Sequence, residues 1–281
     1  MEVSRADGSV IAVEVAGKPD GVPVLLCHGL ADSRLSALQL DDVAAELGLR
    51  VVAPDRPGSG RSDPRVLRTL ADWAQDAALV LDEMEVGSAA VAGISAGGPF
   101  AAACAATLPD RVRSLTLIAA LGPPAWPTVG MAAGERLSLE VARRAPAFGG
   151  WFLCRLAGLA RSNPRLFLRV ATSELPVADR RTIAEPVMRD AFLASYIEAF
   201  RNDSQGVAQD LRVLSQPWGF ELAAISVPTS VHHGEADTTV PPEHARRYAE
   251  AIPGARLHLH PGHGHFSILA AAREMLSPLA G

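Results

Sequence analysis

The sequence predicts an α/β fold in which a mostly parallel central sheet, flanked by helices, is interrupted by an inserted helical cap. Apolar runs rich in Val, Ile, Leu and Ala alternate with segments of helical periodicity. Such continuous apolar strands are typical of parallel sheets that are buried on both faces. The alternation stops in a proline-rich segment that begins near residue 121, and from about residue 130 to 218 only helix-like segments are found. We therefore expect a core of residues 1–121 and 219–281 and a cap of residues 122–218.

Each element follows from its local pattern. β-Branched and apolar residues concentrate in the expected strands, which are, in chain order, residues 9–17, 22–29, 50–55, 88–94, 112–120, 227–234 and 255–260. Helical spacing of apolar residues places the expected core helices at residues 35–48, 68–84, 97–110, 241–252 and from about 266 onward. Thr69 and Asp72 have capping-box spacing at the start of the second of these helices. The helix-like segments of the cap are residues 134–145, 148–160, 163–172 and 185–203.

Composition and charge favour a protein that works on small molecules. The chain has 281 residues, 48% of them hydrophobic, and a net charge of −5 without a cluster of Lys and Arg, so nucleic acid and anionic membranes are not expected partners. The scattered Cys27, Cys104 and Cys154 predict neither a disulfide framework nor a zinc cluster and favour a reducing compartment. The charged first ten residues lack the apolar core of a signal peptide. We expect a cytoplasmic monomer or homodimer that binds a small-molecule substrate.

The segment Gly93-Ile94-Ser95-Ala96-Gly97 joins an expected strand to an expected helix and fits the pattern G-x-S-x-G. A serine at such a turn must adopt a strained backbone conformation to expose its hydroxyl, and the flanking glycines remove Cβ atoms that would collide. The helix that follows aims the Ala96 N–H at a developing oxyanion. Alone the pentapeptide is weak evidence, because a simple Gly/Ser turn between strand and helix has the same pattern.

A base and an acid for this serine follow two later strands. Asp237 follows the strand at 227–234, and His265 follows the strand at 255–260. A serine is a weak nucleophile unless a histidine takes its proton and a carboxylate orients that histidine. Because the carboxyl ends of the strands gather at one edge of an open sheet, we expect the three side chains to meet there. Glu235 is a rival acid and His263 a rival base, since each lies two residues from the expected group.

Four motifs together resemble those of the α/β-hydrolase superfamily, in its lid-bearing type, over essentially the whole chain. They are His28-Gly29-Leu30 after an early strand, the segment DRPGSGRSD from Asp55, the serine turn GISAGG, and the pair GEADTTVP with GHGHF. The resemblance implies that the segment from Asp55 is a structural loop, and its G-H-F match favours His265 over His263 as the base.

The resemblance also implies a mechanism. Ser95, Asp237 and His265 stand in the chain order that the family uses for its triad. The HGL segment corresponds to the family's oxyanion loop, which implies that the Leu30 N–H is the second oxyanion donor beside that of Ala96.

Six histidines crowd the end of the chain and raise the question of a metal. They are His232, His233, His258, His260, His263 and His265. Imidazole suits zinc, but no nearby acid or cysteine completes a ligand set, and leucines that alternate with histidines at 257–260 are typical of an edge or surface strand. The glycine-rich segments match neither a P-loop nor a dinucleotide-binding pattern. We therefore expect no metal and no cofactor.

These observations predict a serine hydrolase, carboxylesterase-like (EC 3.1.1), that acts on an ester, lactone or thioester. The candidates for the walls of its substrate pocket are His28, Trp126, Trp151, Phe152, Tyr196, Trp218 and His263. Acidic residues of the cap also allow recognition of a substrate amine; they are Glu174, Glu185, Glu198 and Asp203. A C–C bond hydrolase, an aminopeptidase, a cofactor-free haloperoxidase, a lyase and a ligand receptor with little turnover remain alternatives, because the same scaffold serves them all.

Overall fold

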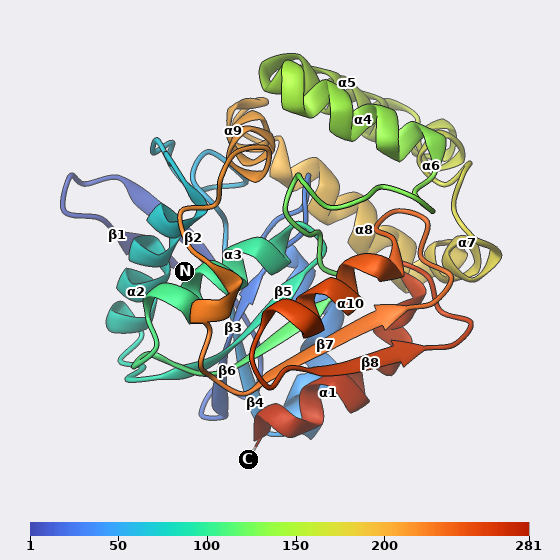
Figure 1. Cartoon of the computed structure of the whole chain (residues 1–281). Helices are drawn as coiled ribbons and strands as arrows, with labels where there is room; N and C mark the ends of the chain where they lie inside the picture. The colour runs from blue at the N-terminus through green and yellow to red at the C-terminus, as the bar shows by residue number, and fades with distance from the viewer. Residues whose placement is uncertain (281) are drawn as a thin grey trace.

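An eight-stranded sheet runs through the centre of the molecule and carries helices on both faces (Figure 1). The computed structural model describes residues 1–280, apart from the side chains of residues 138 and 142. In the order in which they lie side by side, the strands are β1 (Glu2–Ser4), β2 (Val10–Gly17), β4 (Leu49–Pro54), β3 (Val22–Cys27), β5 (Ala89–Ile94), β6 (Val112–Ile118), β7 (Thr229–Gly234) and β8 (Arg256–His260). Neighbouring strands from β4 to β8 run parallel, whereas β2 is antiparallel to both β1 and β4. The predicted mostly parallel α/β sheet is confirmed.

Two layers of helices bury the two faces of the sheet. The core helices are α1 (Asp41–Glu46), α2 (Trp73–Glu83), α3 (Gly97–Thr107), α10 (Pro242–Ala251) and α11 (Ala272–Leu276). Helices α2, α3 and α10 share one apolar core, to which Trp73, Phe100 and Tyr248 contribute fully buried rings. Helices α1 and α11 belong to a second core on the other side. Because strands β3 and β5 in the middle of the sheet are covered on both faces, their residues are apolar throughout instead of alternating with polar ones.

Some elements differ from the expectation. Strand β1 was not predicted, because three residues are too few to show a strand period. The expected helix at 35–48 begins as a 3₁₀ helix, Arg34–Leu40, before α1. Its first residue is fixed by a tertiary contact, since the Arg34 N–H donates to Asp55 Oδ1 at 2.6 Å, and local propensity does not report such a contact.

Six helices stand between β6 and β7, and we call them the cap. They are α4 (Ala133–Arg144), α5 (Pro146–Ser162), α6 (Pro164–Ala171), α7 (Val177–Ala184), α8 (Pro186–Ala199) and α9 (Gln205–Leu214). Figure 1 shows α4 and α5 on the outside of the molecule, with α8 and α9 between them and the sheet. Phe167, Tyr196 and Phe200 form a separate apolar cluster there, which also includes Ala31 from the loop after β3. Within residues 1–280, no helix combines the length and the apolar character needed to cross a membrane.

Candidate active site

Ser95 lies at the turn between β5 and α3 with a φ of 55°, a region that residues other than glycine rarely adopt. Hydrogen bonds hold this strained turn in place. The Ser95 N–H donates to the Ile118 carbonyl at 2.8 Å, and the Ser95 carbonyl accepts from the Gly98 and Leu121 N–H groups at 3.0 Å each. The strain that the sequence predicts at this serine is therefore present, and the end of β6 helps to maintain it.

The two glycines that flank the turn are required by close backbone contacts. A Cβ atom on Gly97 would lie 2.0 Å from the Cys27 carbonyl oxygen, and one on Gly93 would lie 2.6 Å from the Gly97 carbonyl oxygen. Neither contact can be relieved by moving a side chain, because both neighbours are backbone atoms. The spacing G-x-S-x-G thus reflects how tightly α3 turns back against β3 and β5.

The side chains of Ser95, His265 and Asp237 form a hydrogen-bonded row. His265 Nε2 lies 3.0 Å from Ser95 Oγ, and His265 Nδ1 lies 2.7 Å from Asp237 Oδ2. Each residue follows the carboxyl end of a strand, β5, β8 and β7 respectively. Burial acts to lower the pKa of His265, but the charge and hydrogen bond of Asp237 raise it above its ordinary value. The imidazole is thus placed to take a proton from the serine.

Asp237 is held as a charged group inside the protein. Its Oδ1 accepts hydrogen bonds from the Thr239 and Val240 N–H groups at 2.8 and 2.9 Å. Its Oδ2 faces His265 and also His233, whose Nε2 lies 3.2 Å away. Burial acts to raise the pKa of Asp237, but the two histidines hold it well below its ordinary value. The carboxylate therefore remains ionised while it orients the His265 ring.

The rival residues lie elsewhere. Glu235 is exposed, and only its backbone N–H is engaged, with the His260 carbonyl. The His263 ring turns back onto its own loop, with Nδ1 2.8 Å from the Ser267 carbonyl oxygen. The structure therefore brings Asp237 and His265 to the serine, and neither rival.

Two backbone donors stand beside the serine. A Cβ atom built on Gly29 would lie 3.7 Å from Ser95 Cβ, so the loop after β3 passes directly over the nucleophile. Among the described residues, neither the Leu30 N–H nor the Ala96 N–H donates to another protein group. Both N–H groups are therefore available to donate to a bound molecule.

A buried arginine from the segment after β4 fixes this loop. Arg56 Nη1 donates to the His28 carbonyl at 2.6 Å, and Nη2 donates to the Gly29 carbonyl at 2.7 Å. Its Nε donates to Asp210 Oδ2 on α9 at 2.9 Å, and both side chains are fully buried. A cap residue thus neutralises the arginine that holds the loop after β3.

A second cap helix contacts the same loop through hydroxyl and carboxylate groups. The Gly29 N–H donates to Asp32 Oδ2 at 3.2 Å, and the Ser33 N–H donates to Ser195 Oγ at 3.1 Å. The Ser195 hydroxyl on α8 in turn donates to Asp32 Oδ1. Burial raises the pKa of Asp32 despite these hydrogen bonds. The loop after β3 is therefore braced by α8 as well as by α9.

Several residues predicted to wall the pocket have other positions. His28 is buried within its loop, where its Nε2 accepts the Arg56 N–H at 3.3 Å, because the segment after β4 that carries Arg56 packs against this loop. Tyr196 packs in the cap core against Phe167 at 4.8 Å and donates its hydroxyl to the Leu153 carbonyl. These side chains serve the packing of the loop and the cap.

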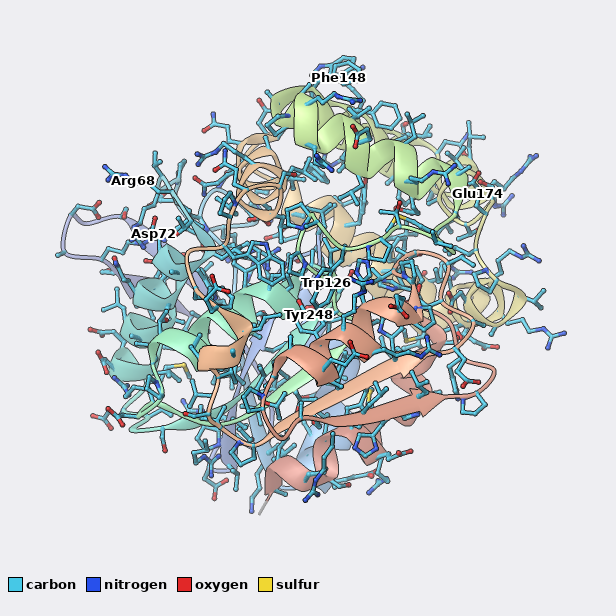
Figure 2. The ribbon with its side chains drawn as sticks, in the orientation of Figure 1. Arg68, Asp72, Trp126, Phe148, Glu174 and Tyr248 are labelled. Carbon is cyan, nitrogen blue, oxygen red and sulfur yellow. The ribbon has the colours of Figure 1, made fainter. Side chains whose placement is uncertain are left out.

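Two further candidates lie on the outside of the cap. Trp151 and Phe152 are about half exposed, at 51% and 47%. Trp151 packs against Phe148 with ring centroids 5.6 Å apart, and Figure 2 shows Phe148 at the outer end of the cap. On the amphipathic helix α5 these rings occupy the face turned away from the core, which helical periodicity alone does not reveal.

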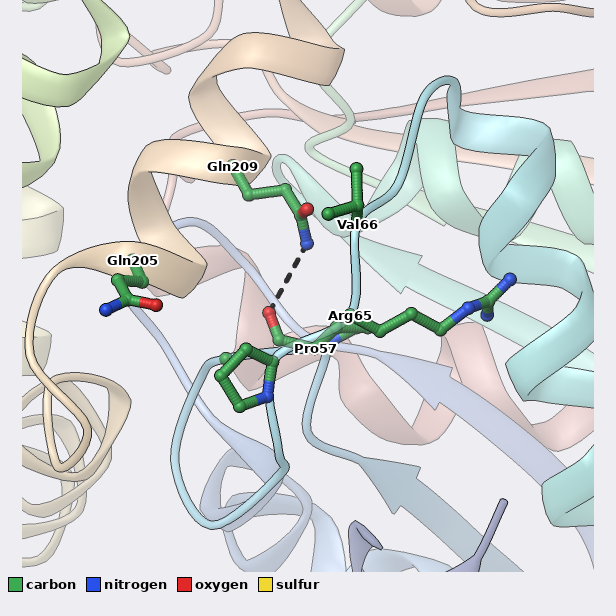
Figure 3. A pocket seen from close by; sticks show the side chains of 7 residues that line it. Pro57, Arg65, Val66, Gln205 and Gln209 are labelled. Carbon is green, nitrogen blue, oxygen red and sulfur yellow. Dashed lines mark hydrogen bonds between the residues drawn. The ribbon is translucent and has the colours of Figure 1, made fainter. Parts of the chain in front are cut away.

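Trp126 and Trp218 do come together, but in a groove whose lining does not include the serine or the histidine. The groove has a volume of about 1370 Å³ and lies between residues 123–128, α4 and residues 215–222. Trp126 lines this groove and lies edge-on to Tyr248, with ring centroids 4.9 Å apart (Figure 2). A smaller pocket of about 190 Å³ lies between the segment after β4 and α9, where Gln209 Nε2 donates to the Pro57 carbonyl at 3.5 Å (Figure 3).

Three of the crowded histidines, His232, His258 and His260, pack together across β7 and the edge strand β8. His232 Nδ1 lies 3.1 Å from His260 Nε2, and His258 stacks on His232 with ring centroids 4.5 Å apart. The edge position of β8 agrees with the prediction for residues 257–260, and Glu274 of α11 approaches His260 Nδ1 at 4.0 Å. Burial lowers the pKa of His232 to about 3. In the described part of the chain, no three His, Cys, Asp or Glu side chains converge as metal ligands would.

Glu198, one of the acidic residues predicted to recognise a substrate amine, already forms ion pairs with two arginines. Glu198 Oε1 accepts from Arg34 at 2.9 Å, and Arg201 lies 3.0 Å from Glu198 Oε2. A second, Glu174, accepts the Gly134 N–H at 2.8 Å. Structural contacts therefore occupy both carboxylates.

Sequence reasoning missed the polar residues by which the cap reaches the site. Asp210 shares a helical face with Val207 and Leu214, and an acid on an apolar face is a usable signal for a buried partner. Asp179 on α7 gives the same signal, since it is buried one turn before Ile183. His233 on β7 also contacts Asp237, but the sequence singled it out only as one of several crowded histidines.

Comparison with known proteins agrees with this fold. The profile of the family described as alpha/beta hydrolase fold matches residues 22–272. A hydrolase of Bacillus subtilis, YcgS, is 28% identical over 271 residues, which cover 94% of this chain and 91% of that protein. The 2-hydroxymuconate semialdehyde hydrolase of Pseudomonas putida is 26% identical over 258 residues, or 91% and 84% of the two chains. The structure of a thermophilic esterase from Thermogutta terrifontis is similar with a TM-score of 0.70 at 25% identity, over 100% of this chain and 99% of that one. The chain belongs to the α/β-hydrolase fold family.

Proposed function

We propose that this protein is a serine hydrolase that cleaves a small-molecule ester, lactone or thioester through an acyl-enzyme at Ser95. The observation that carries the proposal is the row in which Asp237 Oδ2, His265 and Ser95 Oγ follow one another at 2.7 and 3.0 Å. It is supported by the backbone N–H groups of Leu30 and Ala96, which have no partner among the described residues. A nucleophile, an oriented base and an oxyanion site are the parts that acyl transfer requires.

Each group has one step to perform. Ser95 Oγ bonds to the substrate carbonyl carbon while its proton passes to His265 Nε2, and the carbonyl oxygen becomes an oxyanion that accepts hydrogen bonds from the Leu30 and Ala96 N–H groups. The C–O or C–S bond then breaks, and the leaving group takes the proton from Nε2. Water then attacks the acyl-enzyme carbonyl while His265 Nε2 takes its proton. The bond to Ser95 Oγ breaks, the proton returns to that oxygen, and the carboxylic acid leaves. Asp237 stays ionised and stabilises the imidazolium in both halves.

Supporting this substrate class is the likeness to a solved esterase at 25% identity over the whole chain. We further propose that residues 1–121 and 219–281 act as the catalytic core and residues 122–218 as its cap, since the six helices α4 to α9 fall within that insertion. A cytoplasmic location is also proposed, because Cys27, Cys104 and Cys154 are all free thiols.

The test is turnover of a panel of p-nitrophenyl esters, lactones, thioesters and aminoacyl amides, together with labelling by a fluorophosphonate. We expect Ser95→Ala to lose labelling and at least ~10³-fold in kcat on the preferred class. Ser162→Ala is the matched control, because that hydroxyl is exposed and bonds only its own helix. A wild-type protein that is not labelled, or that turns over every compound no faster than Ser95→Ala, would refute the proposal.

A second candidate is hydrolysis of a C–C bond beside a carbonyl. It is favoured by the relative named as a hydrolase of 2-hydroxymuconate semialdehyde, a compound that contains no ester bond. Adding a dienone with a cleavable C–C bond to the panel distinguishes the two candidates, because each predicts the larger kcat/KM on its own class.

A further inference from the structure

Asp179 on cap helix α7 is fully buried and directed at the loop that carries His265. Its Oδ2 accepts the His265 N–H at 2.8 Å. Its Oδ1 accepts the N–H groups of Phe266 and Ser267 at 3.1 and 2.8 Å and the Ser267 hydroxyl at 2.7 Å. One carboxylate from the cap thus satisfies three consecutive backbone donors of the loop, beginning at the histidine itself.

The Asp179 carboxylate lies directly against the backbone of the loop that carries His265. A Cβ atom on Gly264 would lie 2.4 Å from Asp179 Oδ2, so the second glycine of the G-H-G-H-F segment leaves room for the carboxylate. The Gly264 N–H is held in turn by Ser267 Oγ at 2.7 Å. The loop on both sides of His265 is therefore arranged around Asp179.

We propose that Asp179 is a positioning residue for the base: it sets the backbone of His265 so that Nε2 reaches the serine and Nδ1 reaches Asp237. The inference deepens the proposed function and rests on it. A buried carboxylate that accepts four hydrogen bonds fixes a loop far more tightly than a single neutral contact does. Displacing a catalytic group by about 1 Å can cost on the order of 100-fold in rate, so the orientation of this loop bears directly on turnover.

Asp179 also acts on His265 through its charge. Burial acts to lower the pKa of His265, and three carboxylates oppose it: Asp237 most strongly, then Asp179 on α7 and Glu135 on α4. Removing the charge of Asp179 alone should therefore lower the pKa of His265. A residue that only supported the packing of the cap would leave this pKa unchanged.

Asp179→Asn separates these effects. The carbonyl oxygen of asparagine can keep the place of Oδ1 and its three hydrogen bonds, but its NH₂ group then faces the His265 N–H, donor against donor. We expect kcat to fall by about 10- to 100-fold with little change in KM. We also expect the acid limb of kcat/KM and the NMR-titrated pKa of His265 to move to lower pH. Asp190→Asn is the control, because Asp190 is an exposed cap acid that pairs only with Arg189, and its kcat should stay within twofold.

Ser267→Ala provides a second variant in case Asp179→Asn does not fold. It removes one of the four hydrogen bonds to Asp179 and keeps the charge, so we expect a severalfold loss in kcat without a change in the pKa of His265. The proposal is overturned if folded Asp179→Asn retains both the kcat and the His265 pKa of the wild type, or if Asp179→Asn fails to fold and Ser267→Ala has wild-type kcat. A wild-type protein with neither labelling nor turnover would refute the hydrolase function, whereas the His265 titration would still decide whether Asp179 acts on the histidine.

Discussion

Replacement of Asp237 by asparagine tests the catalytic row most directly. Because Oδ1 accepts two backbone N–H groups at 2.8 and 2.9 Å, the carbonyl oxygen of the asparagine must take that place. Its NH₂ group then occupies the position of Oδ2, 2.7 Å from His265 Nδ1. An amide donor there requires Nδ1 to be the acceptor, so the ring proton moves to Nε2 and faces Ser95. The histidine in this tautomer cannot take the serine proton.

Loss of the correct tautomer and of the carboxylate charge predicts a fall of about 10⁴-fold in kcat, equivalent to about 5 kcal/mol of transition-state stabilisation. The assay is p-nitrophenyl ester hydrolysis from pH 5 to 9, with circular dichroism to show that the fold is retained. Glu235→Gln is the matched control, since this neighbouring acid is exposed, and it should leave kcat within twofold. A folded Asp237→Asn variant whose kcat stays within tenfold of the wild type would refute the assignment of the acid.

Three further outcomes are expected. His265 must be neutral to accept a proton and its pKa is raised, so kcat/KM should decline as pH falls through a value above that of free histidine; a profile flat down to pH 5 would contradict this. In Gly97→Ala the new Cβ would lie 2.0 Å from the Cys27 carbonyl oxygen. The variant should lose more than ~2 kcal/mol of stability in urea unfolding and should no longer be labelled by a fluorophosphonate. Unaltered labelling would disprove the steric argument. Arg56→Met leaves the fully buried Asp210 charge unpaired, so it should lower the free energy of unfolding by about 3–5 kcal/mol, or Tm by roughly 10 °C. The double variant with Asp210→Leu removes the unpaired charge and should restore most of this stability. If the double variant is no more stable than the single one, the charge argument fails.

The serine turn could be predicted because its physics is local. The strained φ of Ser95 and the close contact between Gly93 and Gly97 arise within one strand, one turn and one helix. The residues concerned are therefore close in the sequence and form a recognisable motif. The meeting of Asp237 and His265 with Ser95 could also be anticipated, because parallel strands bring their carboxyl ends to one edge whatever the length of the chain between them.

The polar contacts of the cap could not be anticipated in this way. Asp210 reaches Arg56 across 154 residues and Asp179 reaches His265 across 86, and the apolar periodicity of short helices does not define the angle at which they pack. The same limitation explains why Trp151 and Tyr196, chosen as pocket walls for their aromatic rings, lie at the cap surface and in the cap core.

By itself the sequence predicted seven of the eight strands, the strained turn at Ser95, and the two loops whose Asp237 and His265 reach it, because burial on both faces of a sheet and steric limits at a turn both act on residues that are close in the sequence. Only the tertiary structure decided that the rivals Glu235 and His263 lie away from the serine, and which buried cap residues brace the loop after β3 and the loop that carries His265. These contacts depend on the angles at which the helices pack against one another, which the sequence of each helix does not define. Buried charges pair with one another because that packing excludes water from them.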